Sequence, residues 1–261
     1  MAGVFLIDIP RFVVSYSDKS KDYGYSDSVK RENMLSALKE ASSDYCMYCY
    51  RQTSNDGDNI GQLEHAIEKS NSKYLVDCMP NLGLACSKCN QSYKRRGEAL
   101  RKPCDKDIID FETACECSDG TKKCFDPCDA FIILKQKYAS NQASHIILQP
   151  VGVELRKDIP LMIQYNVLSA KFQPATQYNY TRDELEFIND HIRQFNLNDS
   201  KRKTRELFNY VKDVVDCQKC LSWERYRNYI VKLFVEELNK YEKENRIKIC
   251  EKVYSILFPL M

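Results

Sequence analysis

Cys46-Met47-Tyr48-Cys49 and Cys86-Ser87-Lys88-Cys89-Asn90 are the two stretches that decide how the chain between them folds. Each stretch places two cysteines three positions apart, a spacing that lets both sulfurs reach one metal ion. Two such pairs supply the four ligands of a tetrahedral zinc site. We therefore predict a structural Zn²⁺ bound by four cysteines, with no coordination position left for water: Cys46, Cys49, Cys86 and Cys89. The alternative is four free thiols, because cysteine also packs well as a small apolar side chain.

The composition is that of a globular protein. The chain has 261 residues, of which 43% are hydrophobic and 29% are charged, and this is enough to bury a core. The net charge of +2 does not identify a partner. Thirteen cysteines favour a reducing cytoplasm, where spaced cysteines bind metal more often than they form disulfides. We expect neither a signal peptide nor a membrane-spanning helix, because polar residues interrupt every apolar stretch before it reaches about 18 residues.

The segment between the two cysteine pairs is 36 residues long, which exceeds the usual gap in a zinc ribbon. It contains Glu64-His65, and His65 is one of only three histidines in the chain. Asn81 precedes the second cysteine pair and Asn90 follows it directly. We expect the zinc to hold the ends of this segment, so that its polar side chains keep a fixed arrangement.

The order of these residues resembles a known enzyme family. Cys46-x-x-Cys49, Glu64-His65, Asn81-Leu82, Cys86-x-x-Cys89-Asn90 and Lys94 follow one another as in the zinc-bearing form of the HNH endonucleases, the ββα-metal nucleases. The resemblance covers about residues 44–96 and implies metal-assisted hydrolysis of phosphodiester bonds.

The resemblance also implies a role for each of four residues. Glu64 and Asn90 bind a catalytic divalent cation, Mg²⁺ or Mn²⁺, His65 is the general base, and Asn81 orients the loop that carries the histidine. The chemistry of the side chains agrees, because Mg²⁺ prefers oxygen ligands and a neutral imidazole can take a proton from water. We expect a carbonyl or amide oxygen, such as that of Asn81, to hold the second ring nitrogen of His65. Glu68, where the family commonly has proline, adds a carboxylate near the cation.

A basic segment begins within the second cysteine pair. Between positions 88 and 102 the chain has six basic residues and one acidic residue. We assign four of them to nucleic-acid binding through phosphate contacts, with DNA favoured over RNA: Lys88, Lys94, Arg95 and Arg96. The alternative is an ordinary solvated helix face.

The expected fold class is α+β, with a zinc-stabilised ββα-metal HNH module embedded in a larger helix-rich domain. We divide the chain into an N-terminal segment with one helix (1–43), the HNH module (44–102), and short strands followed by C-terminal helices that dock a partner (103–261). The expected strands are 4–7, 131–134 and 145–151, and 103–128 is expected to be an irregular connector. Helices are expected at 27–41, from the Thr181 and Glu184 capping box, at 200–217 and at 222–244.

The other cysteines and histidines do not form two pairs with matching spacing, and they do not match the family pattern. We favour free thiols over a second zinc for five cysteines with irregular spacing: Cys104, Cys115, Cys117, Cys124 and Cys128. Cys217 and Cys220 lack a partner pair, and His145 and His191 are expected to be structural.

A second, weaker resemblance lies in the distal half. Asp126-Pro127 and Phe195-Asn196-Leu197-Asn198, with Arg202 and Arg205, look like the HNH subunits of bacterial Septu-type and retron-associated anti-phage systems. This resemblance implies a partner ATPase of the ABC/SMC type. The chain itself has no GxxxxGK[ST] phosphate-binding loop.

The function expected from the sequence is that of a cytoplasmic HNH endonuclease in phage defence. The alternative is a non-catalytic zinc-ribbon protein that binds nucleic acid or acts as a scaffold. A third reading is a structural zinc module that tethers a helical interaction domain.

Overall fold

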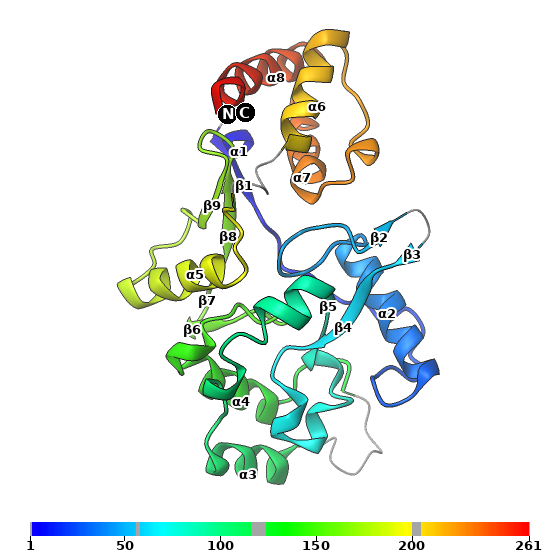
Figure 1. Cartoon of the computed structure of the whole chain (residues 1–261), viewed down its shortest axis with the longest axis vertical. Coiled ribbons are helices and arrows are strands. Elements are labelled where there is room, and N and C mark those ends of the chain that lie inside the picture. The colour runs from blue at the N-terminus through cyan, green and yellow to red at the C-terminus, as the bar shows by residue number, and fades with distance from the viewer. Residues whose placement is uncertain (1, 56–57, 116–123, 200–204, 261) are drawn as a thin grey trace.

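The chain has the expected α+β class. The computed structural model describes residues 2–55, 58–115, 124–199 and 205–260. Figure 1 shows helices α6, α7 and α8 at one end of an elongated molecule, together with both termini. A small sheet lies below these helices, and the segments between β2 and α4 form the other end.

The strands are short and pair only in antiparallel fashion. They are β1 (Leu6–Asp8), β2 (Ser54–Asn55), β3 (Asp58–Asn59), β4 (Gly61–His65), β5 (Leu82–Cys86), β6 (Glu154–Arg156), β7 (Ile159–Pro160), β8 (Ile163–Asn166) and β9 (Lys171–Pro174). The largest sheet has the order β1-β8-β9, and β2-β3, β4-β5 and β6-β7 are two-stranded. In the largest sheet Leu6 pairs with Asn166, which joins the first residues of the chain to its distal half.

Two predicted helices begin at the caps that their sequences provide. The helices are α1 (Ala2–Phe5), α2 (Ser28–Ser42), α3 (Asp105–Ala114), α4 (Asp129–Ala139), α5 (Arg182–Gln194), α6 (Arg205–Cys217), α7 (Tyr229–Leu238) and α8 (Lys243–Leu257). The Asp27 side chain accepts a hydrogen bond from the backbone of Lys30 at the start of α2. Thr181 and Glu184 form the predicted capping box of α5.

Several element predictions were wrong. Residues 2–5 are helical, so the first strand begins only at Leu6. Residues 105–114 form α3 within the expected irregular connector. The expected strand at 131–134 is part of α4, because Phe131, Leu134 and Tyr138 recur at helical spacing and are buried on one side. The structure has no strand at 145–151.

The expected long helix at 222–244 is also interrupted. Arg227 has a left-handed backbone conformation, with φ of 47°, which ends a short turn over Glu224–Tyr226. The Asn228 side chain then caps α7 by accepting from the backbone N–H groups of Ile230 and Val231. Only the capping residue marks this break, because the apolar spacing continues through it. The expected end was also wrong, since α7 ends at Leu238 and α8 begins at Lys243.

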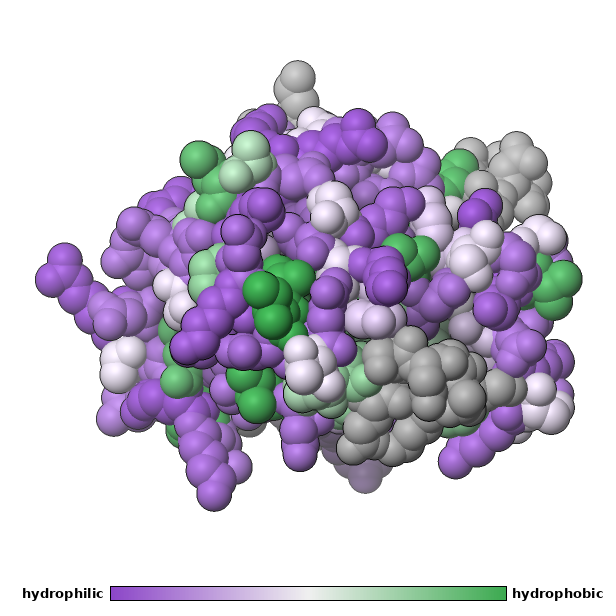
Figure 2. All heavy atoms as spheres, turned by 90° about the horizontal axis from the view of Figure 1, so that it is seen from below, coloured by the Kyte–Doolittle hydropathy of each residue, from purple (hydrophilic) through white to green (hydrophobic). Residues whose placement is uncertain are grey.

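The three expected regions share one continuous hydrophobic core, which includes Met34, Leu84 and Phe187. Large apolar side chains that remain exposed are scattered along the chain. The lower face of the molecule in Figure 2 is mostly hydrophilic, with small separate hydrophobic groups. In the described ranges, the longest helices have 15 residues, and none is both long and apolar enough to cross a bilayer.

The β4-β5 hairpin and the turn that follows it position the candidate site. Glu64 pairs with Gly83 and His65 pairs with Leu82, so both polar residues lie at the end of β4 next to the connecting loop. Gly83 is required because a Cβ atom there would lie 2.9 Å from the carbonyl oxygen of Gln149. After β5 the chain enters a π-helical turn, Cys89–Tyr93, in which Lys94 N donates to Cys89 O.

Candidate functional site

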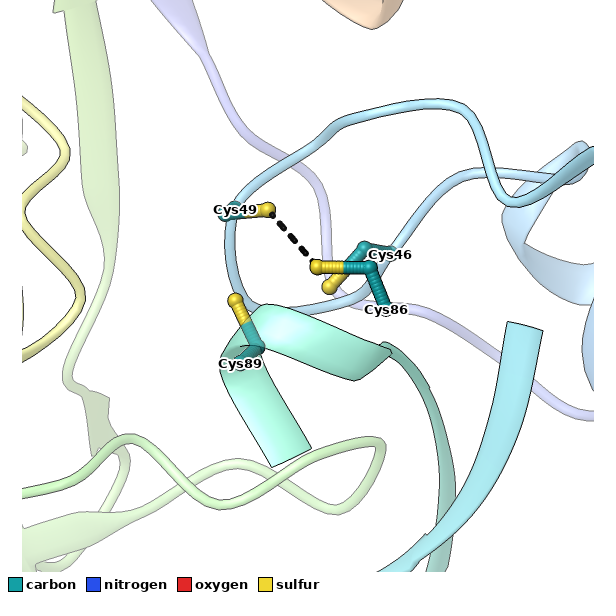
Figure 3. A group of neighbouring side chains, drawn as sticks. All are labelled: Cys46, Cys49, Cys86 and Cys89. Carbon is teal, nitrogen blue, oxygen red and sulfur yellow. Dashed lines mark hydrogen bonds between the residues drawn. The ribbon is translucent and has the colours of Figure 1, made fainter. Parts of the chain in front are cut away.

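The four predicted zinc ligands come together. Figure 3 shows the side chains of Cys46, Cys49, Cys86 and Cys89 converging from two segments. All four are buried, their sulfurs lie within 4.8 Å of one another, and Cys49 Sγ is 3.7 Å from Cys86 Sγ. Tetrahedral ligands about 2.3 Å from a zinc ion are about 3.8 Å apart, so the arrangement is compatible with a structural zinc site.

The local backbone explains why the first cysteine pair faces the second. Cys46 N donates to Arg51 O, and Tyr50 N donates to Cys46 O at 2.8 Å. Tyr50 has a φ of 61°, so the chain turns back on itself immediately after Cys49. Met47 N donates to Leu84 O at 2.9 Å and ties this turn to β5.

The four thiols also compete for protons. Hydrogen bonds from the other cysteines, that of Cys46 first, hold the pKa of Cys86 well below its usual range. Burial raises the pKa of Cys46 instead. The thiolate is the form of cysteine that binds metal, so a divalent cation bound by the cluster would take the place of the thiol protons.

Three of the four predicted catalytic residues line one cavity. The cavity has a volume of about 200 Å³, and its walls include Glu64, His65 and Asn90. Glu64 and His65 come from the end of β4, whereas Asn90 comes from the π-helical turn that begins at a cysteine of the cluster. The two walls are joined through β5, which pairs with β4 and ends at Cys86 of the cluster.

His65 is held as a neutral imidazole. Its Nε2 lies 3.1 Å from Val76 O, and because a carbonyl oxygen only accepts, Nε2 must carry the proton. The lone pair is then on Nδ1. Burial lowers the pKa of His65 to about 4, and the positive charges of Lys69 and Lys94 add to this effect. A backbone carbonyl oxygen, that of Val76, thus fixes the tautomer of His65. The expectation from the sequence was either a carbonyl or an amide oxygen in this role.

Asn81 does not contact the imidazole, and that part of the prediction was wrong. Its Oδ1 accepts from Ile67 N at 2.7 Å, and its Nδ2 donates to Ile67 O at 2.9 Å and to Leu75 O at 3.3 Å. The side chain is fully buried and lies beneath the loop that begins after His65. It therefore orients the loop rather than the ring.

Glu64 belongs to a buried network. Its Oε2 accepts from Tyr48 Oη at 2.6 Å, and its Oε1 accepts from the ammonium group of Lys94. The Lys94 ammonium also donates to the carbonyl oxygens of His65 and Ala66. Lys94 is only 4% exposed, so it neutralises Glu64 and does not lie on the surface expected for nucleic-acid binding.

The carboxylate of Glu68 is committed to a second network. Glu68 lines the cavity, but its Oε1 accepts from Arg101 and both oxygens accept from Tyr138. Arg101 is 1% exposed and also donates to the carbonyl oxygens of Lys94 and Arg96. This arginine therefore secures the turn at residues 94–101 and is not a surface cation.

The remaining predicted nucleic-acid contacts are exposed. Lys88, Arg95 and Arg96 are solvent-accessible, and Arg95 lines the cavity. Lys88 Nζ lies 5.3 Å from the centre of the Tyr93 ring, and the Arg96 guanidinium lies 5.7 Å from it. Asn90 Nδ2 donates to Gln62 Oε1 at 3.1 Å, so the Asn90 amide is held against β4.

Sequence reasoning missed Tyr25, Asp77 and Val76, which surround His65. The Tyr25 ring lies 4.7 Å from the imidazole, and Asp77 accepts from the backbone of residues 25 and 26. No spacing rule connects residue 25 with residue 65, because only the tertiary fold brings them together. Tyr48, within the first cysteine pair, was the one missed residue with a local signal.

The other cysteines and histidines do not extend the site. Among the residues that the structure describes, the only group of metal-ligand side chains is the four-cysteine cluster. Cys104, Cys115 and Cys128 are thiols as predicted, and Cys117 lies outside the described residues. Cys124 is disulfide-bonded, so the prediction of a free thiol was wrong at that position. His145 Nδ1 lies 2.7 Å from Asp190 Oδ2. His191 is buried and its Nδ1 accepts from Ile147 N, which suits a structural role.

No protein-family model, curated protein or solved structure matches this chain.

Proposed function

We propose that this chain is a metal-dependent HNH endonuclease that hydrolyses phosphodiester bonds of nucleic acid. The observation that carries the proposal is the single cavity lined by Glu64, His65 and Asn90. The order of elements supports it, because two antiparallel strands are followed by a helical turn and the cysteine cluster joins their ends.

His65 is the residue that we assign as general base. The Nε2–H group is held by Val76 O, so Nδ1 is the nitrogen that would take a proton from the attacking water. The lowered pKa keeps the ring neutral at neutral pH, which is the form that a base requires. Asn81 holds the loop that leads to Val76 and is therefore a positioning residue.

The donor set fits a hard cation such as Mg²⁺ or Mn²⁺. Glu64 and Asn90 offer a carboxylate and an amide oxygen on the same cavity, and oxygen donors are what these ions prefer. When bound, such a cation would stabilise the negative charge of the phosphate and of the leaving oxygen. Because Lys94 already neutralises Glu64, the ammonium group competes with the cation for the Oε1 atom.

The substrate that we propose is DNA rather than RNA, with Lys88, Arg95 and Arg96 contacting the phosphate backbone. Support comes from the exposure of these three side chains, of which Arg95 lines the cavity. Such contacts provide affinity without reading sequence.

The test is a Mg²⁺-dependent cleavage assay on supercoiled DNA and on tRNA-sized RNA. We expect His65→Ala to abolish nicking while leaving nucleic-acid binding intact. His145→Ala is the matched control, because His145 lies outside the cavity, and it should cleave normally. Equal cleavage by the His65→Ala protein would overturn the proposal.

A non-catalytic zinc-ribbon protein is the second candidate. The observation that favours it is that both oxygens of Glu64 already accept hydrogen bonds, from Lys94 and Tyr48. This candidate predicts nucleic-acid binding without cleavage at any concentration of Mg²⁺ or Mn²⁺.

We further propose that the nuclease acts in bacterial phage defence with an ABC/SMC-type ATPase docked on the C-terminal helices. The exposed Phe258 and Leu260, in the short helical turn that follows α8, support a docking role for this region. Arg202, one of the residues behind this expectation, lies outside the described residues. Co-elution of the purified chain with a candidate ATPase tests the idea, and independent elution of the two proteins argues against it.

A further inference from the structure

Tyr25 gathers two cations beside the candidate base. Lys69 Nζ lies 4.0 Å from the centre of the Tyr25 ring, and the Arg31 guanidinium lies 4.8 Å from it. The Arg31 Nη2 atom also donates to Tyr25 O at 3.0 Å. The same ring lies 4.7 Å from the imidazole of His65, so one aromatic side chain contacts all three groups.

The position of Tyr25 is set by the segment that also fixes His65. Asp77 Oδ1 accepts from Tyr25 N at 2.6 Å and from Ser26 N at 2.8 Å. Its neighbour Val76 provides the carbonyl oxygen that holds His65 Nε2. Two consecutive residues thus fix the ring and the base, and the distance between them does not depend on flexible side chains alone.

The two cations are available for a ligand. Lys69 and Arg31 are both exposed, and within the described ranges neither pairs with a carboxylate. Lys69 also lines the cavity that contains Glu64, His65 and Asn90. A cation held over an aromatic ring keeps its charge and its remaining hydrogen-bond donors while losing conformational freedom.

We infer that Lys69 and Arg31, ordered by Tyr25, form a phosphate-binding subsite for the nucleic-acid backbone next to the cleaved bond. This inference rests on the proposed nuclease function. It adds a second group of phosphate contacts beside the cavity that contains Glu64, His65 and Asn90. Of the basic residues proposed above, Lys88 lies within the second cysteine pair and residues 95 and 96 follow it. This subsite instead combines the N-terminal segment with the loop after β4. A backbone that enters the cavity therefore meets positive charge from two separate parts of the chain.

The test measures binding separately from cleavage. In a His65→Ala background without divalent cations, the affinity for a fluorescein-labelled DNA duplex is followed by anisotropy across a series of salt concentrations. Each lost phosphate contact lowers the slope of log K against log salt by about 0.9. We expect Lys69→Gln and Arg31→Gln each to weaken binding and to reduce this slope by about that amount.

Two matched controls make the test specific. Lys73 is exposed and its Nζ lies 5.0 Å from the centre of the Tyr74 ring, so it is a cation over a different aromatic ring. Lys73 neither lies over Tyr25 nor lines the cavity, so Lys73→Gln should leave the slope unchanged. Tyr25→Phe keeps the ring and should bind like the parent protein, whereas Tyr25→Leu should lose the effect of both cations.

The outcomes separate this inference from the proposed function. Slopes for Lys69→Gln and Arg31→Gln that equal that of Lys73→Gln would overturn the subsite, even if cleavage is confirmed. Reduced slopes in a protein that never cleaves would support the subsite and overturn the nuclease proposal.

Discussion

Replacing Asn81 by alanine should destabilise the loop after His65 more than any exposed substitution in that loop. The Asn81 amide makes two short hydrogen bonds with the backbone of Ile67, at 2.7 and 2.9 Å, and a longer one with Leu75 O. The side chain is fully buried, so water cannot replace these bonds. Alanine would leave a backbone N–H group and two carbonyl groups without their partner.

The expected loss follows from these groups. A buried donor or acceptor without a partner costs about 1–3 kcal/mol, and the two short bonds dominate. We therefore expect the free energy of unfolding to fall by about 2–4 kcal/mol. This is a large share of the roughly 5–15 kcal/mol that stabilises a typical domain. Cleavage should fall as well, because the displaced loop carries the carbonyl oxygen of Val76 that fixes the tautomer of His65.

Urea denaturation monitored by circular dichroism measures the change in unfolding free energy. Asn71→Ala is the matched control, since Asn71 is the same residue type in the same loop and no side-chain hydrogen bond is found for it in the described part of the chain. The control should change the free energy by no more than about 0.5 kcal/mol. A loss below about 1 kcal/mol for Asn81→Ala would show that these hydrogen bonds do not hold the loop.

Three further predictions concern the metal, the buried ion pair and pH. The purified chain should contain one zinc ion, as measured by atomic emission. The Cys86→Ser protein should lose this ion. The Cys104→Ser protein is the control and should keep it, because Cys104 is an exposed thiol outside the cluster. Lys94→Met should destabilise the protein by about 3–5 kcal/mol because it leaves the Glu64 carboxylate buried and unpaired, and adding Glu64→Gln should restore most of that loss. Burial lowers the pKa of His191 in the folded protein to about 3. In the unfolded chain the pKa of histidine is about 6.5, so below that pH the unfolded chain binds more protons than the folded protein does. The contribution of His191 to the free energy of unfolding, measured by urea titration, should be constant above that pH and fall as the pH is lowered towards 4. The fall should be shallower in the His191→Gln protein. An equal fall in both proteins would contradict a neutral, buried His191.

The cysteine cluster could be predicted because two cysteine pairs with equal spacing are a local signal. The grouping of Glu64, His65 and Asn90 was expected from the family resemblance, and all three line one cavity. The burial of Lys94 could not be predicted, since a lysine in a basic segment has the same local sequence whether it faces solvent or a carboxylate. The sequence also could not decide whether Phe131 belongs to a strand or to a helix. A short apolar run is compatible with the periodicity of either element.

The pairing of β1 with β8 has a consequence for how the chain is made. Leu6 and Asn166 are 160 residues apart, so the first strand leaves the ribosome long before its partner exists. At about 5–20 residues per second this interval lasts on the order of 8–30 s. The cysteine cluster needs only residues up to Cys89, so the predicted zinc ion would be able to bind within that time. The supply of metal during translation would then determine whether the segment around the cysteine cluster is folded before β1 pairs with β8.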